Sequence, residues 1–195
     1  MTQPEINIDR LIQHDRQEYA ALVDSFSDRI YRLALRMTGD EQDAEDVLQE
    51  TFIKVFKYIE GFKGNSSLAT WIYRIAMNEA LMLLRKHRPE GYSLDEENDD
   101  EDFTPRQIAS WDALPEQNLM SVETTQHLRE AVLKLPEILR GVFLLRDTEH
   151  FTVKETAEAL GITEGTVKVR LLRARLKLRE HLSIYFSETN LEVQA

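Results

Sequence analysis

The segment from Thr152 to Arg179 constrains the fold of this chain more than any other stretch. Thr152, followed three residues later by Glu155, has the capping-box pattern that opens a helix. Gly161 then stands where a tight turn needs a positive φ, and Thr163 can cap a second helix. The pattern predicts a helix-turn-helix, in which the second helix lies in the DNA major groove.

The second helix divides into a core side and a charged side when its residues are placed at about 100° intervals. A narrow arc that we predict to be buried holds Val167, Leu171, Ala174 and Leu178. On the opposite side lie Val169, Leu172 and Arg173. One flank beside them carries Lys168, Arg175 and Arg179, and the other flank carries Arg170 and Lys177. Two basic flanks suit the two phosphate backbones of a groove. An ordinary amphipathic surface helix is the alternative, but the cap, the turn and the charge together favour DNA binding.

The net charge of −11 argues against DNA binding only if it is spread evenly along the chain. Residues 90–120 alone carry −9, whereas residues 121–186 carry +2. The stretch 90–120 has no helical period, and so acidic a segment cannot bury enough apolar surface to offset its chain entropy. It is predicted to be a flexible acidic linker, in which Phe103, Ile108 and Trp111 indicate local docking. Its acidic run lacks the glycine and terminal glutamate spacing of an EF-hand, so a calcium loop is not favoured.

The hydrophobic periodicity predicts an all-α protein with two small helical domains joined by this linker. The domains are expected at 1–89 and 121–186, with a tail at 187–195. The predicted helices span 8–14, 16–37, 41–60 and 67–87 in the first domain, and 122–134, 137–147, 153–160 and 164–183 in the second.

The third predicted helix presents an acidic face. Its core side is predicted to consist of Ala44, Leu48, Phe52, Val55 and Ile59, whereas the opposite arc holds Asp43, Asp46, Glu50, Ile53 and Lys57. An exposed isoleucine beside carboxylates is typical of a protein-docking surface. A solvated acidic face near a helix N-terminus explains the pattern equally well.

The fourth predicted helix combines aromatic, amide and basic side chains. Trp71, Arg74, Asn78 and Arg85 fall on one stripe. Unpaired nucleic-acid bases use such groups for stacking, edge hydrogen bonds and charge neutralisation. The residues alone favour the simpler alternative of a core tryptophan beside a surface cation.

Catalysis, metal binding and membrane insertion find little support in the sequence. There is no Cys, the five His are scattered, and no nucleophile motif or phosphate-binding glycine loop is present. We expect no enzymatic activity, no metal and no cofactor. No basic, apolar leader and no apolar run of about 20 residues is found, so a soluble cytoplasmic protein without membrane insertion is expected.

Three segments together resemble the extracytoplasmic-function (ECF) sigma factors, the small two-domain promoter-specificity subunits of bacterial RNA polymerase. DAEDVLQETF is similar to the core-binding motif, and FKGNSSLATWIYRIAMN to the loop and helix for minus-ten recognition and promoter melting. The segment from Leu135 to Glu180 resembles the domain that reads the minus-thirty-five element. The likeness covers about residues 16–186, and the chain departs from the usual pattern at Glu79, Met82 and the run RKHRP.

The resemblance implies a role for each of three residue sets. It places Asp46, Gln49 and Glu50 against the β′ clamp helices of core RNA polymerase, and the exposed arc of the same helix adds Ile53. It assigns the melted minus-ten DNA to Phe62, Lys63, Asn65, Ser66 and Asn78, to which the stripe on the fourth helix adds Trp71, Arg74 and Arg85. It assigns the double-stranded minus-thirty-five DNA to Val169, Leu172 and Arg173, to which the start and flanks of the second helix add Thr166, Lys168, Arg170, Arg175 and Lys177.

Further partners implied by the resemblance are the polymerase β flap and an anti-sigma factor, which can hold the protein at the membrane. Two alternatives remain. A stand-alone helix-turn-helix regulator would bind operators without polymerase, and a sigma mimic would sequester an anti-sigma factor. The mimic is not favoured because the chain has no room for an added phosphoreceiver domain.

Overall fold

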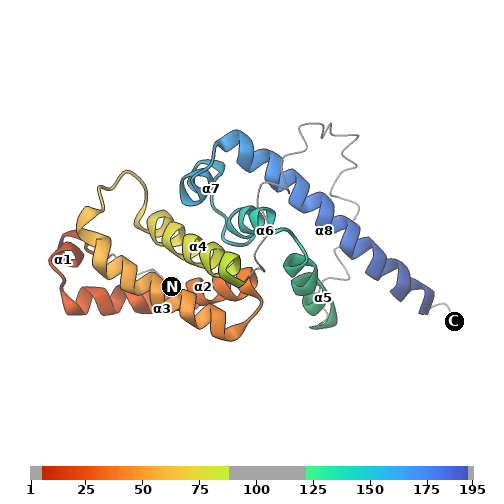
Figure 1. Ribbon diagram of the computed structural model, residues 1–195, viewed down its shortest axis with the longest axis horizontal. Helices are drawn as coiled ribbons and strands as arrows, with labels where there is room; N and C mark the ends of the chain where they lie inside the picture. Colours follow the sequence, from red (N-terminus) through yellow and green to blue (C-terminus); the bar gives the residue numbers. More distant parts are fainter. Residues whose placement is uncertain (1–5, 88–121, 193–195) are drawn as a thin grey trace.

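A computed structural model describes residues 6–87 and 122–192 (Figure 1). All regular elements within these two ranges are helical. The N-terminal unit comprises α1 (Ile8–Ile12), α2 (Arg16–Thr38), α3 (Glu41–Tyr58), the 3₁₀ turn η1 (Ile59–Gly61) and α4 (Leu68–His87). The C-terminal unit comprises α5 (Val122–Leu133), α6 (Glu137–Phe143), the π turn η5 (Leu144–Thr148), α7 (Val153–Leu160) and α8 (Glu164–Glu192).

The predicted all-α architecture of two helical units is confirmed. The largest differences from the expected helix boundaries lie in the C-terminal unit, and the other boundaries agree within two residues. The helix expected at 137–147 widens into the π turn η5, and α8 continues to Glu192. Beyond Gly165 the sequence contains no glycine or proline that would end a helix, which accounts for the extension. The predicted linker at 90–120, with Phe103, Ile108 and Trp111, lies outside the described residues.

Local capping fixes the ends of the N-terminal helices. Asp15 accepts hydrogen bonds from the backbone N–H groups of Gln17 and Glu18 and so opens α2. Asp40 does the same for α3 through Gln42 and Asp43. Between these helices Gly39 ends α2 with a φ of +81°, a conformation that glycine adopts without the strain of a Cβ atom.

The core side of α3 agrees with its helical period. Ala44, Phe52, Val55 and Ile59 are buried, and Leu48 is half-buried against the same core. Helices α2, α3 and α4 pack on one another and form the body of the N-terminal unit.

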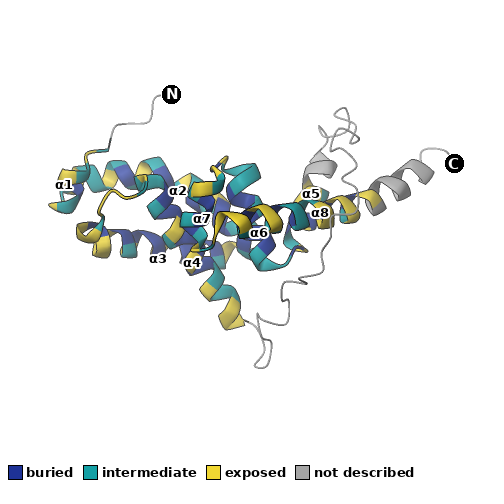
Figure 2. Ribbon diagram, turned by 90° about the horizontal axis from the view of Figure 1, so that it is seen from above, coloured by how far each residue is buried: buried dark blue, intermediate teal, exposed yellow. Residues whose placement is uncertain are grey.

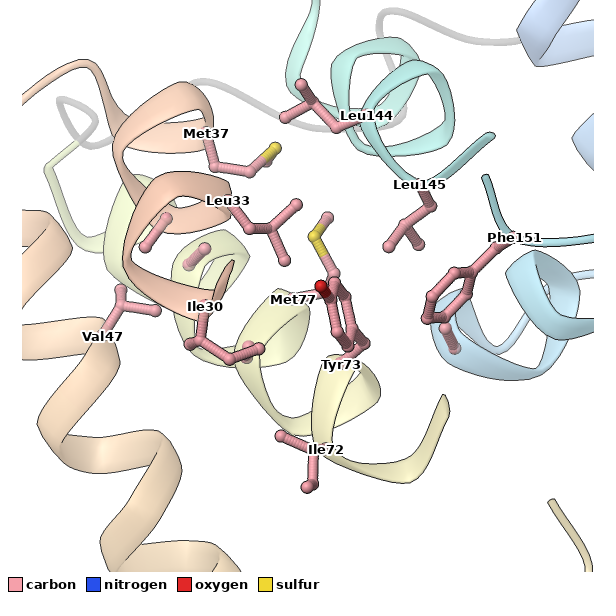
Figure 3. Close-up of a cluster of buried hydrophobic side chains, with 14 of the residues drawn as sticks. Ile30, Leu33, Met37, Val47, Ile72, Tyr73, Met77, Leu144, Leu145 and Phe151 are labelled. Atoms are coloured by element: carbon pink, nitrogen blue, oxygen red, sulfur yellow. The ribbon is translucent and has the colours of Figure 1, made fainter. Parts of the chain in front are cut away.

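The two units share a hydrophobic core instead of standing apart. Figure 3 shows Tyr73 and Met77 of α4 between Ile30, Leu33 and Met37 of α2 and the side chains of Leu145 and Phe151 in the C-terminal unit. Tyr73, Met77 and Leu145 are each 0% exposed. Buried residues therefore continue from α2 and α3 into α6 and α7 (Figure 2). The shared core sets the relative position of all three candidate surfaces.

Candidate nucleic-acid and protein-docking surfaces

The predicted docking residues of α3 all face solvent. Asp46, Gln49, Glu50 and Ile53 are exposed, and Ile53 is 56% exposed although it is an aliphatic side chain. They lie on the side of α3 opposite to its buried residues. Monomeric proteins carry single exposed apolar residues routinely, but an apolar centre with an acidic rim has the layout of an interface.

Phe56 extends this surface and was missed by the sequence analysis. It lies three residues after Ile53, which places both on one side of α3, and it is 45% exposed. Its ring packs on the rings of His14 and Tyr19, with 4.6 Å and 5.2 Å between the ring centroids. The helical spacing from Ile53 was the signal that could have identified it. We call Asp46, Gln49, Glu50, Ile53 and Phe56 the α3 face.

The polar loop before α4 is shaped by a glycine and a serine. Gly64 has a φ of +67°, which turns the loop between Lys63 and Asn65. Ser67 accepts a hydrogen bond from the backbone N–H of Thr70 at 3.0 Å and starts α4. Lys63 and Asn65 are exposed and Ser66 is half-buried, so this loop offers its polar side chains to a ligand.

The stripe along α4 is continuous with this loop. Phe62 packs on Trp71 with 5.4 Å between ring centroids, so the tryptophan is half-buried. Arg74, Asn78 and Arg85 are exposed farther along the helix. Trp71 thus contributes to the core and keeps part of its surface accessible. The structure brings all eight predicted minus-ten residues onto one loop and one helix.

The departure from the family pattern at Glu79 has a structural explanation. Glu79 is 7% exposed and pairs with Nζ of Lys54 in α3 at 2.6 Å. Its charge is therefore neutralised between α3 and α4 and does not face the stripe. Met82 is 55% exposed on the same helix. The basic end of α4 is described as far as His87, and the rest of the run RKHRP lies outside the described residues.

The predicted helix-turn-helix is present in α7 and α8. Thr152 Oγ1 accepts from the Glu155 N–H, and the Glu155 carboxylate accepts from the Thr152 N–H at 2.8 Å, which completes the capping box. Gly161 ends α7 with a φ of +66°. Thr163 then accepts from the Thr166 N–H at the start of α8. The predicted core arc is confirmed, because Val167, Leu171, Ala174 and Leu178 are all buried.

The side chains on the outward side of α8 differ in their exposure to solvent more than the helical period suggests. Lys168, Val169 and Lys177 are exposed, and Val169 is 44% exposed. The half-buried members of the predicted set are Thr166, Arg170, Leu172, Arg173 and Arg175. These eight residues line the first four turns of α8, where a recognition helix contacts bases and phosphates.

Arg175 has a structural partner in this conformation. Its guanidinium donates from Nε and Nη2 to the two carboxylate oxygens of Asp147, at 2.9 and 2.7 Å. The hydrogen bond to this carboxylate raises the pKa of Arg175. A bidentate pair holds the planar fork in a fixed direction, so Arg175 anchors α8 to η5.

Two further findings concern other classes of site. Among the described residues, no three His, Cys, Asp or Glu side chains gather in a way that could hold a metal ion. None of the described helices combines the length and the apolar character needed to cross a membrane.

Comparison with known proteins shows which family the chain resembles. Residues 22–90 match the family described as Sigma-70 region 2, and residues 125–178 match Sigma-70, region 4. The chain is 37% identical over 169 residues to the ECF RNA polymerase sigma factor SigW of Bacillus subtilis, covering 86% of this chain and 90% of the relative. This chain belongs to the ECF sigma factors.

Solved structures share the fold of this ECF sigma factor. CnrH, solved in complex with the cytosolic domain of CnrY, superimposes with a TM-score of 0.66 at 20% identity, over 91% of this chain and 95% of CnrH. The sigma factor RpoE from Bartonella quintana, solved with the anti-sigma factor NepR, gives a TM-score of 0.63 at 23% identity, over 86% and 98% of the two chains.

Proposed function

We propose that this ECF sigma factor binds core RNA polymerase, directs it to specific promoters and helps to open the minus-ten duplex, without covalent chemistry. The observation that carries the proposal is the exposure of three separate surfaces on one chain: the α3 face, the loop with the α4 stripe, and the outward side of α8. A stand-alone DNA-binding regulator requires only the last of them.

The α3 face is the proposed site for the β′ clamp helices. Ile53 and Phe56 supply an apolar centre that partner side chains can cover. The carboxylates of Asp46 and Glu50 favour a partner whose surface carries basic side chains around that centre. Charges at the rim of an interface steer association and exclude wrong partners more than they add affinity.

The loop 62–67 and the α4 stripe are the proposed site for unpaired minus-ten bases. A base turned out of the duplex needs a stacking surface, hydrogen-bonding groups for its edge and cations for the neighbouring phosphates. Phe62 and Trp71 provide the aromatic surface, Asn65 and Ser66 the polar groups, and Arg74 the charge.

The outward side of α8 is the proposed reader of the minus-thirty-five duplex. Val169 and Leu172 can contact thymine methyl groups, and Arg173 can reach a guanine edge. Lys168 and Lys177 are exposed on opposite flanks, where they would neutralise the two phosphate backbones. We assign contact with the β flap of the polymerase to the same C-terminal unit.

Regulation by an anti-sigma factor belongs to the same proposal. The Bartonella quintana RpoE that shares this fold was solved with such a factor bound. An anti-sigma factor that spans the membrane would also hold this chain at the membrane surface, although none of its own described helices can cross it.

In vitro transcription with purified core polymerase tests the proposal. The double substitution Asp46→Lys and Glu50→Lys should abolish binding to core polymerase, because it reverses the charge on the α3 face. Asp24→Lys with Asp28→Lys makes the same change on the exposed side of α2 and should leave binding intact. A wild-type chain that bound promoter DNA alone and never associated with polymerase would establish the stand-alone regulator instead.

The division of labour between the units has its own test. Arg173→Ala should reduce discrimination at the minus-thirty-five element by about tenfold, the value of one good base contact. Binding to core polymerase should persist. Lys134→Ala, an exposed cation at the end of α5, is the control. Loss of polymerase binding in Arg173→Ala would contradict the assignment.

A further inference from the structure

Met82 is an apolar side chain in the middle of the polar stripe along α4. It is 55% exposed. It lies four residues after Asn78 and three residues before Arg85, and this spacing places all three on one side of the helix. Between Arg74 and Arg85 the exposed residues of α4 are Arg74, Asn78, Met82 and Arg85. Met82 is therefore the one apolar member of this exposed row.

The position of Met82 distinguishes it from an ordinary exposed apolar residue, of which most protein surfaces carry several. Arg74 and Arg85 lie on the two sides of it, separated by about 16 Å along the helix axis at 1.5 Å per residue. A DNA strand whose phosphates pair with both guanidinium groups passes over the helix between them. Such a strand covers Met82, so the side chain loses its contact with water when DNA binds.

The charge on this side of α4 favours nucleic acid as the ligand. Glu79 is the one acidic residue in the sequence of α4, and it is 7% exposed and paired with Nζ of Lys54 at 2.6 Å. No carboxylate of α4 therefore opposes a phosphate along the exposed row. The last turns of α4 also extend outside the packed helices, where they are open to a large ligand (Figure 2).

The side chain of Met82 selects one kind of base edge. Thymine carries a methyl group at C5, which is an apolar group on a base edge that is otherwise read by hydrogen bonds. A methionine side chain is flexible and polarisable, so it adapts its shape to such a group. It offers no strong donor or acceptor to a polar edge. We propose that Met82 contacts the methyl group of a thymine in the minus-ten element and makes this chain prefer thymine at that position.

This inference rests on the proposed function of the loop 62–67 and the α4 stripe, and it adds a specificity-determining residue to that site. The helical rise also predicts which base is involved. Asn78 and Met82 are about 6 Å apart along the axis, which corresponds to roughly two bases at 3.4 Å per nucleotide of one strand. The thymine should lie one or two nucleotides from the base contacted by Asn78, on the side away from the loop 62–67.

Selection of DNA from a promoter library tests the position of the contact. The library is randomised over the minus-ten element and is bound by holoenzyme assembled from core polymerase and this chain. Asn78→Ala should lose its base preference at one position. Met82→Gln should lose a preference for thymine of about fourfold, the value of one buried methyl group, at a different position one or two nucleotides away. Met82→Leu stays apolar and should retain the preference.

Replacement of that thymine by deoxyuridine tests the methyl group itself, because it removes the methyl and leaves base pairing unchanged. The wild-type holoenzyme should bind the deoxyuridine promoter about fourfold more weakly than the thymine promoter. Met82→Gln should bind the two promoters equally. Tyr58→Gln changes a side chain of α3 that is exposed to a similar degree, 51%, and should discriminate between them as the wild type does.

The remaining outcomes separate this inference from the proposed function. If the wild-type holoenzyme opens promoters but binds thymine and deoxyuridine equally at every minus-ten position, the role of Met82 is refuted and the proposed function stands. If Met82→Gln weakens binding to core polymerase and leaves the base preference unchanged, Met82 is a protein contact and the proposal is also overturned. If neither Asn78→Ala nor Met82→Gln alters any minus-ten preference, the proposed minus-ten site on α4 fails as well.

Discussion

At the scale of single residues, Arg140 connects the carboxyl ends of two helices. Its guanidinium donates to the carbonyl oxygen of Met37 near the end of α2 and to those of Leu133 and Leu135 at the end of α5. The last carbonyls of a helix lack intrahelical partners and favour a nearby cation. Arg140 is 7% exposed, and burial lowers its pKa. It stays protonated at neutral pH, since an arginine loses its proton only far above it.

Arg140→Met is expected to lower the free energy of unfolding by about 3 kcal/mol, because two buried carbonyl groups and one part-buried carbonyl group lose their donor. Urea denaturation followed by circular dichroism measures the change. Arg179→Met, at an exposed position of α8, is the control and should cost less than about 0.5 kcal/mol. Equal effects of the two substitutions would show that the carbonyl contacts of Arg140 contribute nothing specific.

At the scale of elements, the capping box determines where α7 begins. Thr152→Ala should cost about 1 kcal/mol of unfolding free energy, because the N–H of Glu155 loses its acceptor. Thr152→Ser retains the hydroxyl and should keep most of the stability. Hydrogen exchange resolved by residue measures the loss, which should be concentrated in the first turn of α7. Loss of protection spread evenly over the chain would argue against a local cap.

The same capping box predicts that the free energy of unfolding depends on pH. Hydrogen bonds from the N–H and the hydroxyl of Thr152 lower the pKa of Glu155. A lowered pKa stabilises the fold above the unfolded-state pKa of about 4.3, and this stabilisation is lost as the pH falls through the folded-state value. Glu155→Gln should thus be less stable than the wild type at pH 7, by no more than about 0.5 kcal/mol for so accessible a group. The difference should disappear near pH 3 in urea titrations, and a constant difference would refute this origin.

Features of this kind could be predicted from the sequence because they are local. The capping box, Gly161 and the buried arc of α8 depend on residues a few positions apart, and the outward Ile53 follows from the helical period alone. The ion pair between Arg29 and Glu149, whose charged atoms lie 3.5 Å apart, could not be predicted, since the two residues are 120 positions apart and any surface arginine fits the pattern equally well. For the same reason Arg175 was assigned to DNA, and its pairing with Asp147 became visible only in the folded chain.

At the scale of the whole molecule, the shared core is the feature that the sequence left undetermined. The helical periods could not show that Ile72 and Met77 of one unit pack in the same core as Leu145 of the other. Two separate cores and one continuous core produce the same periodicity, and only the docking of α7 on α4 distinguishes them.

A cavity in this core should weaken both units together. Met77→Ala removes a side chain that is 0% exposed between α2, α4 and the C-terminal unit, and should cost about 3 kcal/mol. Native-state hydrogen exchange should then show reduced protection in α4 and in α7. Leu22→Ala opens a cavity at an equally buried position of α2, where the reduction should stay within the N-terminal unit. If Met77→Ala left the protection of α7 unchanged, the two units would be energetically independent, and the docking would be a contact without consequence for stability.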